Sequence, residues 1–414
     1  MSLFSEKLTP DQVFTPRSAT INPDMYVRRS SLEDMLVSAL QGRLHIVVHG
    51  ESGTGKSWLY KKVLSDQEAT FMVANLANAS RLGSIAAELK NLLEREGNAV
   101  KVAYSEEKAA EVKAVIASGS LSHKGEYEIG QMEPFEACLT SLRRKAGSKP
   151  AVLVLDNLEA AFNDALLKEL ADILILCDDE RYASQRVHIL VVGVPAQLKE
   201  YYYKTPHHRT IANRLFEMPE VSRLTVNEAQ MLLTKGLVEL LKFQMDDQSR
   251  CFTHISWITD RVPQMLQEYG LVLAKLAEKA DGKIDQGLID RADQLWLYQS
   301  LNQPYAVIES HMNERDTKAG RRNQTLLALG TMDGEQFKAA DIDKKIRNLF
   351  PLSTKQTTLN VPQMLASFAG GDRPIIKRSP KGDAFHFVDP RYRMVLRAML
   401  RNQDEKVIKR PMYR

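Results

Sequence analysis

The stretch that most constrains the fold lies between residues 44 and 57 and reads LHIVVHGESGTGKS. Its apolar beginning indicates a buried parallel strand. The pattern Gly50-x-x-x-x-Gly55-Lys56-Ser57 follows at once, and a helical pattern continues to Val63. A strand, a glycine-rich loop and a helix in this order are the context that a phosphate-binding loop requires. The sequence therefore predicts an α/β fold with a parallel sheet around this loop.

The loop has the chemistry of a nucleoside triphosphate site. Glycines let successive backbone N–H groups turn inward around an anion, and the following helix adds the positive end of its dipole. We expect Lys56 to reach the β- and γ-phosphates of ATP and the Ser57 hydroxyl to ligate Mg²⁺. The residues expected to contact the nucleotide are Gly50, Glu51, Ser52, Gly53, Thr54, Gly55, Lys56, Ser57 and Trp58.

A second apolar run, residues 151–155, ends in Asp156. A central parallel strand that delivers a carboxylate to its C-terminal edge has this pattern, so we assign Asp156 to the magnesium site. Hydrolysis also needs a group that orients or deprotonates water. Glu159 is the first candidate and Asn157 the second, although Glu159 is also what a helix start selects to complement its dipole.

Charge neutralisation on the γ-phosphate usually requires an arginine. Arg209 and Arg214 follow the apolar run at residues 187–192 and are the candidates. Arg214 is placed in the catalytic set, acting on a neighbouring subunit of a homo-oligomer. The alternative is that both are ordinary surface arginines.

Apolar periodicity divides the chain into parts. We expect a lead-in over residues 1–25 that packs along the first domain, an α/β core over 26–224, a helical lid over 225–305 and a winged-helix domain over 320–402. A basic tail over 403–414 follows, in which we expect residues 406–414 to be disordered. The winged helix is expected from three helical patterns and a hairpin within residues 323–400. Residues 98–132 are interpreted as an inserted contact or regulatory surface.

Charge is unevenly distributed along the chain. Residues 311–414 contain 21 Lys and Arg against 11 Asp and Glu, a net charge of +10, whereas the remainder, with 35 against 41, carries −6. This asymmetry indicates either an anionic partner, with double-stranded DNA first, or a plain solvated basic surface. Lys377, Arg378 and Lys381 on the expected hairpin are the candidates for phosphate contact.

Other features of the composition fit a cytoplasmic protein. No apolar run approaches the length of a membrane span, and the first residues lack the pattern of a signal peptide. The three cysteines, Cys138, Cys177 and Cys251, are far apart in sequence and indicate buried thiols in a reducing compartment.

Besides the phosphate-binding loop, five segments of the sequence form an ordered set. They are Tyr26-Val27-Arg28-Arg29, Leu155-Asp156-Asn157-Leu158-Glu159, Val191-Val192-Gly193-Val194-Pro195, Asn213-Arg214-Leu215 and Val262-Pro263-Gln264-Met265-Leu266. AAA+ ATPases have such segments in this order, and over about residues 20–280 the chain resembles that family. The nearest groups are the origin-recognition-complex type and the TniB-like transposition ATPases. The resemblance implies a P-loop core, a helical lid and a C-terminal winged helix.

Three departures from the family pattern predict a slow enzyme. The usual Asp-Glu pair is Asp156-Asn157, and the sensor position after residue 192 has Gly193-Val194. Gln264 replaces the lid arginine, and Arg261 is a candidate substitute whose direction on the helix differs. The leading hypothesis is a nucleotide-dependent switch that hydrolyses ATP and engages DNA or a partner protein through the winged helix. The alternative is a STAND-like signalling or anti-phage ATPase that gates a protein effector without binding DNA.

Overall fold

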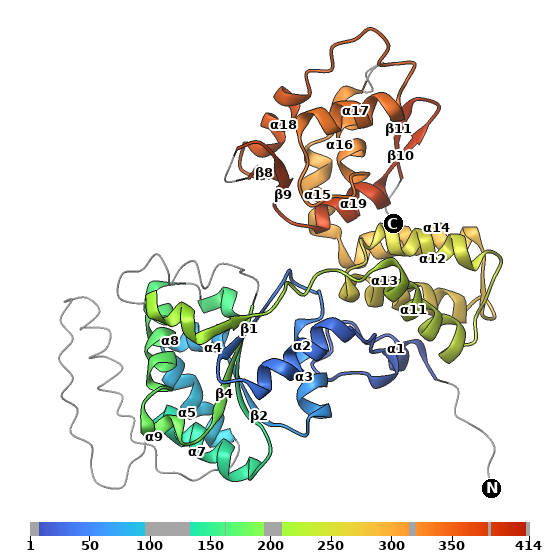
Figure 1. The fold of residues 1–414 in the computed structure, drawn as a ribbon. Coiled ribbons are helices and arrows are strands. Elements are labelled where there is room, and N and C mark those ends of the chain that lie inside the picture. The colour runs from blue at the N-terminus through green and yellow to red at the C-terminus, as the bar shows by residue number, and fades with distance from the viewer. Residues whose placement is uncertain are drawn as a thin grey trace, which may run out of the picture. The chain divides into compact units, whose positions relative to one another are not determined.

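The computed structural model (Figure 1) describes residues 8–95, 133–161, 163–193, 209–313, 320–379 and 382–410. The chain forms two compact units. Ala19–Ile21 and Arg28–Ser222 form the α/β unit, and Met1–Ser18, Asn22–Val27 and Arg223–Arg414 form the helical unit. The expected insertion at residues 98–132 lies outside the described residues.

The α/β unit contains a five-stranded parallel sheet with strand order β2-β3-β4-β1-β5. The parallel core that the apolar runs predict is therefore confirmed. Neighbouring strands β3, β4 and β1 are almost entirely buried because both faces of the sheet are covered, which explains their continuous rather than alternating apolar sequences. The strands are β1 (His45–His49), β2 (Thr70–Asn75), β3 (Ala151–Asp156), β4 (Val187–Gly193) and β5 (Leu215–Glu217).

Helices cover both faces of this sheet (Figure 1). On one face, α2 (Ser30–Gln41) and α3 (Lys56–Asp66) share an apolar core with Ile46 and Val48 of β1. On the other face, the core includes Val47, the strand residue between those two, as expected for side chains that alternate across a strand. The elements there are α4 (Leu76–Leu82), α5 (Ile85–Arg95), α7 (Pro134–Ala146), η2 (Leu158–Ala161), α8 (Asp164–Leu176), α9 (Glu180–Ala183) and η3 (Arg209–Arg214).

The helical unit contains the helices that the sequence predicts after residue 225. The expected capping box is present, because the Thr225 N–H donates to Glu228 Oε2 at 2.7 Å and the Glu228 N–H donates to Thr225 Oγ1 at 3.2 Å. The elements are α11 (Val226–Leu233), the π-helical η4 (Thr234–Leu240), β6 (Gln244–Met245), α12 (Gln248–Ile258), α13 (Pro263–Glu278), β7 (Lys283–Ile284), α14 (Gln286–Ser300) and α15 (Asn302–Ser310).

The N-terminal segment packs mainly within the helical unit, so the expectation that it follows the first domain is wrong. It contains α1 (Pro10–Val13) and η1 (Pro23–Met25). Phe14 is 1% exposed, and its ring lies against Gly236 and Gly270, where an added Cβ would come within 2.4 Å of ring carbons. Two glycines on different helices thus make the space that this aromatic ring fills.

The C-terminal part contains the three helices and the hairpin expected from the sequence. These are α16 (Arg321–Gly330), α17 (Ala339–Leu349), α18 (Val361–Ala369), the antiparallel strands β8 (Ile376–Arg378) and β9 (Phe385–Phe387), and α19 (Arg391–Met399). The disordered tail is corrected in part, since β10 (Leu400–Gln403) pairs with β11 (Lys406–Lys409). Val407 packs against the apolar core, which explains why this charged segment is ordered; residues 411–414 lie outside the described part.

A buried carboxylate joins α19 to the helices before it. Asp260, between α12 and α13, pairs with Arg223 at 2.7 Å, Arg397 at 3.0 Å and Arg393 at 3.3 Å. Arg393 and Arg397 are 2% and 4% exposed, so part of the basic charge counted in the sequence lies inside the protein. The apolar core is likewise continuous from residue 224 to residue 400, across the boundary expected between lid and winged helix.

Candidate nucleotide site

The glycine-rich loop connects β1 to α3 in a conformation that its glycines make possible. Gly53 and Gly55 have φ values of 81° and 93°, which residues with a Cβ rarely adopt. A Cβ at Gly50 would lie 2.4 Å from the carbonyl oxygen of Val221. Thr54, 1% exposed, closes the loop by donating its hydroxyl to the Glu51 carbonyl at 2.8 Å.

Lys56 begins α3 and folds back over the loop. Its ammonium group donates to the carbonyls of Gly50 at 2.8 Å and Glu51 at 2.9 Å. Burial lowers the pKa of Lys56, while the nearby carboxylates, Glu159 first and Asp156 next, act in the opposite direction. The loop therefore holds a cation against its own backbone, where it can exchange carbonyl oxygens for phosphate oxygens.

Asp156 reaches the first turn of α3 from the end of β3. Its Oδ2 accepts from the Ser57 hydroxyl at 3.3 Å and from the Tyr60 hydroxyl at 3.0 Å, and its Oδ1 accepts from the Asn157 N–H at 2.8 Å. Strands β1 and β3 are separated in the sheet by β4, so the two chain segments meet at the C-terminal edge. Sequence reasoning missed Tyr60 as a site residue, although its spacing of three from Ser57 puts both on one helix face.

Glu159 lies in η2, directly after β3, and its side chain is exposed. Gly193 at the end of β4 allows η2 to approach, because a Cβ there would lie 2.5 Å from Leu158 Cβ and 3.1 Å from Glu159 Oε2. The chain thus has a packing reason for glycine at the position where the family resemblance expects a polar sensor. Val194 and Pro195 of that segment lie outside the described residues.

Asn157, the second candidate for water activation, has a φ of 65° and donates its side-chain amide to Asn75 Oδ1 at 3.0 Å. Asparagine tolerates this left-handed conformation better than most residues. Its side chain is therefore bound to the end of β2, which leaves Glu159 as the better placed candidate.

The remaining candidates are dispersed. Arg214 in η3 forms an ion pair with Asp178 of its own chain, and the side chain of Arg209 is not among those described. Ser52 is exposed, and Glu51 and Trp58 are half-buried at the loop and on the first turn of α3. In the helical unit, Gln264 donates to Glu268 at 3.0 Å.

The donor set fits magnesium bound together with a nucleotide. The described part of the chain holds no cluster of three or more His, Cys, Asp or Glu residues that could bind a metal alone. Ser57 and Asp156 offer two oxygen ligands, and Mg²⁺ commonly takes its other ligands from water and substrate phosphates.

Comparison with known proteins agrees with this geometry. Residues 39–201 match a family model described as an AAA domain. The chain contains an AAA domain. Among solved structures, the Walker-type ATPase of Pyrococcus abyssi has a TM-score of 0.51 at 14% identity, covering 92% of this chain and 99% of that one. The Aeropyrum pernix ORC2 protein in ADPNP and ADP complexes has a TM-score of 0.50 at 15% identity, covering 93% and 97%.

These two structures share with this chain a parallel α/β core followed by helices. At such low identity they establish the fold alone. The search of curated proteins finds no match. None of the described helices is long and apolar enough to cross a membrane.

Proposed function

We propose that this AAA domain binds Mg²⁺-ATP at residues 50–58, hydrolyses it slowly, and acts as a nucleotide-dependent switch. The observation that carries the proposal is the meeting of Ser57 and Asp156 beside the ammonium group of Lys56. The Ser57 hydroxyl, the Asp156 carboxylate and the Lys56 ammonium group thus lie together at a loop whose backbone N–H groups can bind an anion.

The residues divide the chemistry between them. Ser57 and Asp156 would hold Mg²⁺, which would supply positive charge to neutralise the phosphates. Lys56 leaves the loop carbonyls for the phosphates, and Glu159 orients the attacking water. Arg214 must exchange Asp178 for a γ-phosphate before it can act on a neighbouring subunit of a homo-oligomer.

Slow hydrolysis follows from the residues around Glu159. Its side chain is exposed, and the position after Asp156 has an asparagine bound to Asn75 rather than a second carboxylate. An exposed carboxylate acts where bulk water reaches the reacting atoms, which reduces its effect on the rate.

The test is ATP turnover by the full chain, with and without double-stranded DNA. We expect Lys56→Ala to lose nucleotide binding and turnover together. Glu159→Gln keeps the size of the side chain and is expected to retain binding while turnover falls by about 10²-fold or more. Turnover of Glu159→Gln equal to that of the parent would remove Glu159 from the mechanism.

We further propose that the C-terminal helices and the β8–β9 hairpin form a winged helix that engages DNA. Lys377 and Arg378 are exposed on β8, and Arg378 lies 5.0 Å above the ring of Phe385, which supports its guanidinium. Lys381 lies outside the described residues. The triple change of Lys377, Arg378 and Lys381 to Ala should weaken DNA binding and flatten its salt dependence; an unchanged salt titration contradicts DNA engagement by this hairpin.

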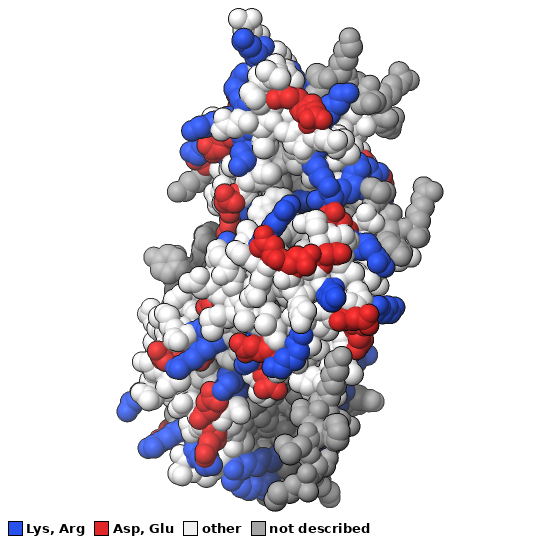
Figure 2. All heavy atoms as spheres, turned by 90° about the vertical axis from the view of Figure 1, so that its right-hand side faces the viewer, with Lys and Arg blue, Asp and Glu red and all other residues white. Residues whose placement is uncertain are grey.

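A protein partner is the second candidate, and α18 favours it. This helix follows two others, as a recognition helix does, yet it carries no charged residue and exposes Pro362, Gln363, Ala366 and Ser367. On the face in Figure 2, Lys and Arg are interspersed with Asp and Glu rather than gathered in one basic patch. A STAND-like ATPase that gates an effector predicts nucleotide retained through purification and no binding of DNA.

A further inference from the structure

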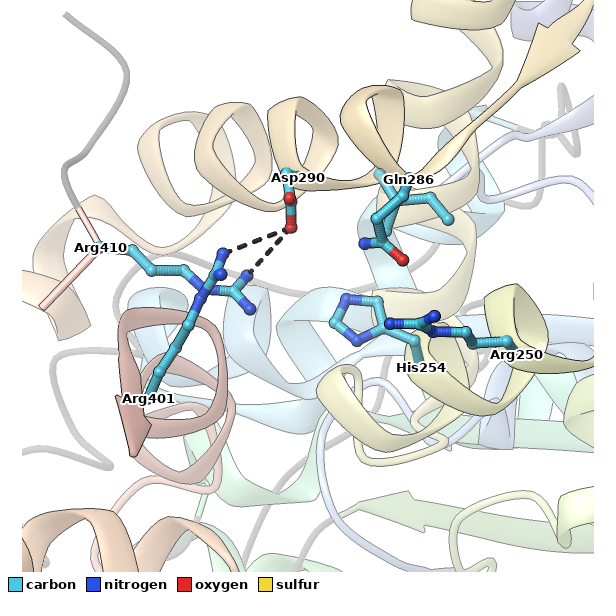
Figure 3. Close-up of a pocket in the computed structure, with 7 residues that line it drawn as sticks. Arg250, His254, Gln286, Asp290, Arg401 and Arg410 are labelled. Carbon is cyan, nitrogen blue, oxygen red and sulfur yellow. Dashed lines mark hydrogen bonds and ion pairs between the residues drawn. The ribbon is translucent and has the colours of Figure 1, made fainter. Parts of the chain in front are cut away.

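A small basic pocket lies within the helical unit, away from the residues discussed so far (Figure 3). It has a volume of about 240 Å³. Helix α12, helix α14 and the C-terminal hairpin contribute its polar lining, which consists of Arg250, His254, Gln286, Asp290, Arg401 and Arg410.

The charges of this pocket are not balanced by its own acids. Asp290 pairs with Arg401 at 3.3 Å and with Arg410 at 3.9 Å, and Arg410 also pairs with Asp293, which is fully buried behind the pocket. Within the described part of the chain, Arg250 has no carboxylate partner for its guanidinium, which is exposed at the pocket. Three arginines against two aspartates leave an excess positive charge.

His254 is held in a defined orientation at the same site. Its Nε2 lies 2.9 and 3.1 Å from the two oxygens of Asp293, which also accepts from Tyr269 at 2.7 Å. An ionised carboxylate at that distance selects the tautomer with a proton on Nε2. The other ring nitrogen, Nδ1, is then an acceptor, which can bind a hydroxyl group of a ligand but not a bare phosphate oxygen.

Figure 3 shows how these groups face one another. Arg250 and His254 lie on one side, Arg401 and Arg410 on the other, and Gln286 and Asp290 project from α14 above them. Donors from three segments thus converge on one space.

We propose that this pocket binds a compact, phosphate-bearing small molecule. Guanidinium groups match the oxygens of phosphate in a bidentate fashion, which makes arginine the usual residue for such recognition. A volume of 240 Å³ is below the range of pockets for drug-sized ligands, about 300–1,000 Å³, so it suits a phosphate monoester better than a whole nucleotide. This inference goes beyond the proposed ATPase and is independent of it.

Binding at this place would connect distant parts of the sequence. Arg250 lies on α12, whereas Arg401 lies on β10 and Arg410 directly follows β11. A phosphate that contacts Arg250 and Arg401 at once would bridge the lid helices and the C-terminal strands, and so stabilise the contact between them.

The test is calorimetric titration of the full chain with inorganic phosphate at constant ionic strength. The phosphate loop is kept occupied with Mg²⁺ and a non-hydrolysable ATP analogue, and the titration is repeated on Lys56→Ala. We expect saturable binding in both proteins, because the pocket does not involve Lys56.

Single changes locate the site. We expect Arg250→Ala and Arg401→Ala each to weaken phosphate binding by about tenfold or more, since a charge-assisted hydrogen bond is lost. Arg401→Lys keeps the charge without the planar fork and should have an intermediate effect. Arg291→Ala removes an exposed arginine of α14 that does not line the pocket, and it should bind phosphate as the parent does.

Arg410 is left unchanged in these variants because its removal would leave Asp293 buried without its cation. Absence of saturable phosphate binding overturns the proposal, as does equal weakening by Arg291→Ala. If phosphate does not bind while Arg250→Ala and Arg401→Ala weaken binding of duplex DNA, the pocket contacts a nucleic-acid backbone instead and the small-molecule assignment is wrong.

Discussion

Replacing Gly193 with alanine tests whether the end of β4 positions the residues that follow β3. The added methyl group would lie 2.5 Å from Leu158 Cβ, whereas carbon atoms in contact are ~3.5–4.0 Å apart. Segment η2 must therefore move by roughly 1 Å, or β4 must move away from it. Overpacking of this kind costs about 1–3 kcal/mol in the free energy of unfolding.

The same displacement should act on hydrolysis more strongly than on binding. A shift of ~1 Å in a catalytic group can reduce a rate by about 10²-fold, and Glu159 Oε2 would lie 3.1 Å from the new methyl group. Single-turnover hydrolysis of ATP measures the rate, calorimetry the affinity and urea unfolding the stability. Gly370→Ala is the matched control, because the added Cβ there meets only an ordinary contact at 3.4 Å. Wild-type turnover by a folded Gly193→Ala protein would refute the role of this close approach.

Two further changes test other parts of the fold. Phe14→Ala should lower the free energy of unfolding of the helical unit by about 3–5 kcal/mol, because it leaves a cavity against Gly236 and Gly270; a loss below about 1 kcal/mol in urea unfolding would contradict this packing. Burial lowers the pKa of His45 to about 4, below the value of 6.5 expected in the unfolded chain. The unfolded chain therefore takes up the proton first as the pH falls from 6.5 towards 4, and this residue should cost about 2 kcal/mol of stability at pH 5 relative to pH 7.5. His45→Asn keeps an acceptor for the Ile189 N–H and should reduce this pH dependence of stability. Urea unfolding midpoints of the variant that fall with pH as steeply as those of the parent would contradict the assignment to His45.

Local patterns were sufficient for the α/β core. A continuous apolar run that ends in Asp156 is typical of a central parallel strand, and the glycines before Lys56 are typical of a phosphate-binding loop. The sequence therefore predicts both strands and the sheet edge at which Asp156 meets Ser57. The helices after residue 225 follow from apolar spacing and from the Thr225 capping box in the same way. Such features depend on residues within one or two turns of each other.

Features that depend on distant partners could not be predicted. The ring of Phe14 is buried against glycines more than 200 residues away in the sequence. Val407 packs against the apolar core, although the charged residues around it give no apolar pattern that would predict this contact. The net charge of residues 311–414 also overestimates the basic charge on the surface, because Arg393 and Arg397 are buried and pair with Asp260. Tyr60 was passed over because its hydroxyl has significance only beside a carboxylate 96 residues further along the chain.

The most direct test of the central claim is calorimetric titration with ATP in the presence of Mg²⁺ or EDTA. We predict saturable binding that is stronger with Mg²⁺ in the parent, loss of binding in Lys56→Ala, and loss of the magnesium-dependent part alone in Asp156→Asn. No heat from the parent, or magnesium dependence that Asp156→Asn leaves intact, would contradict the site described at the ends of β1 and β3.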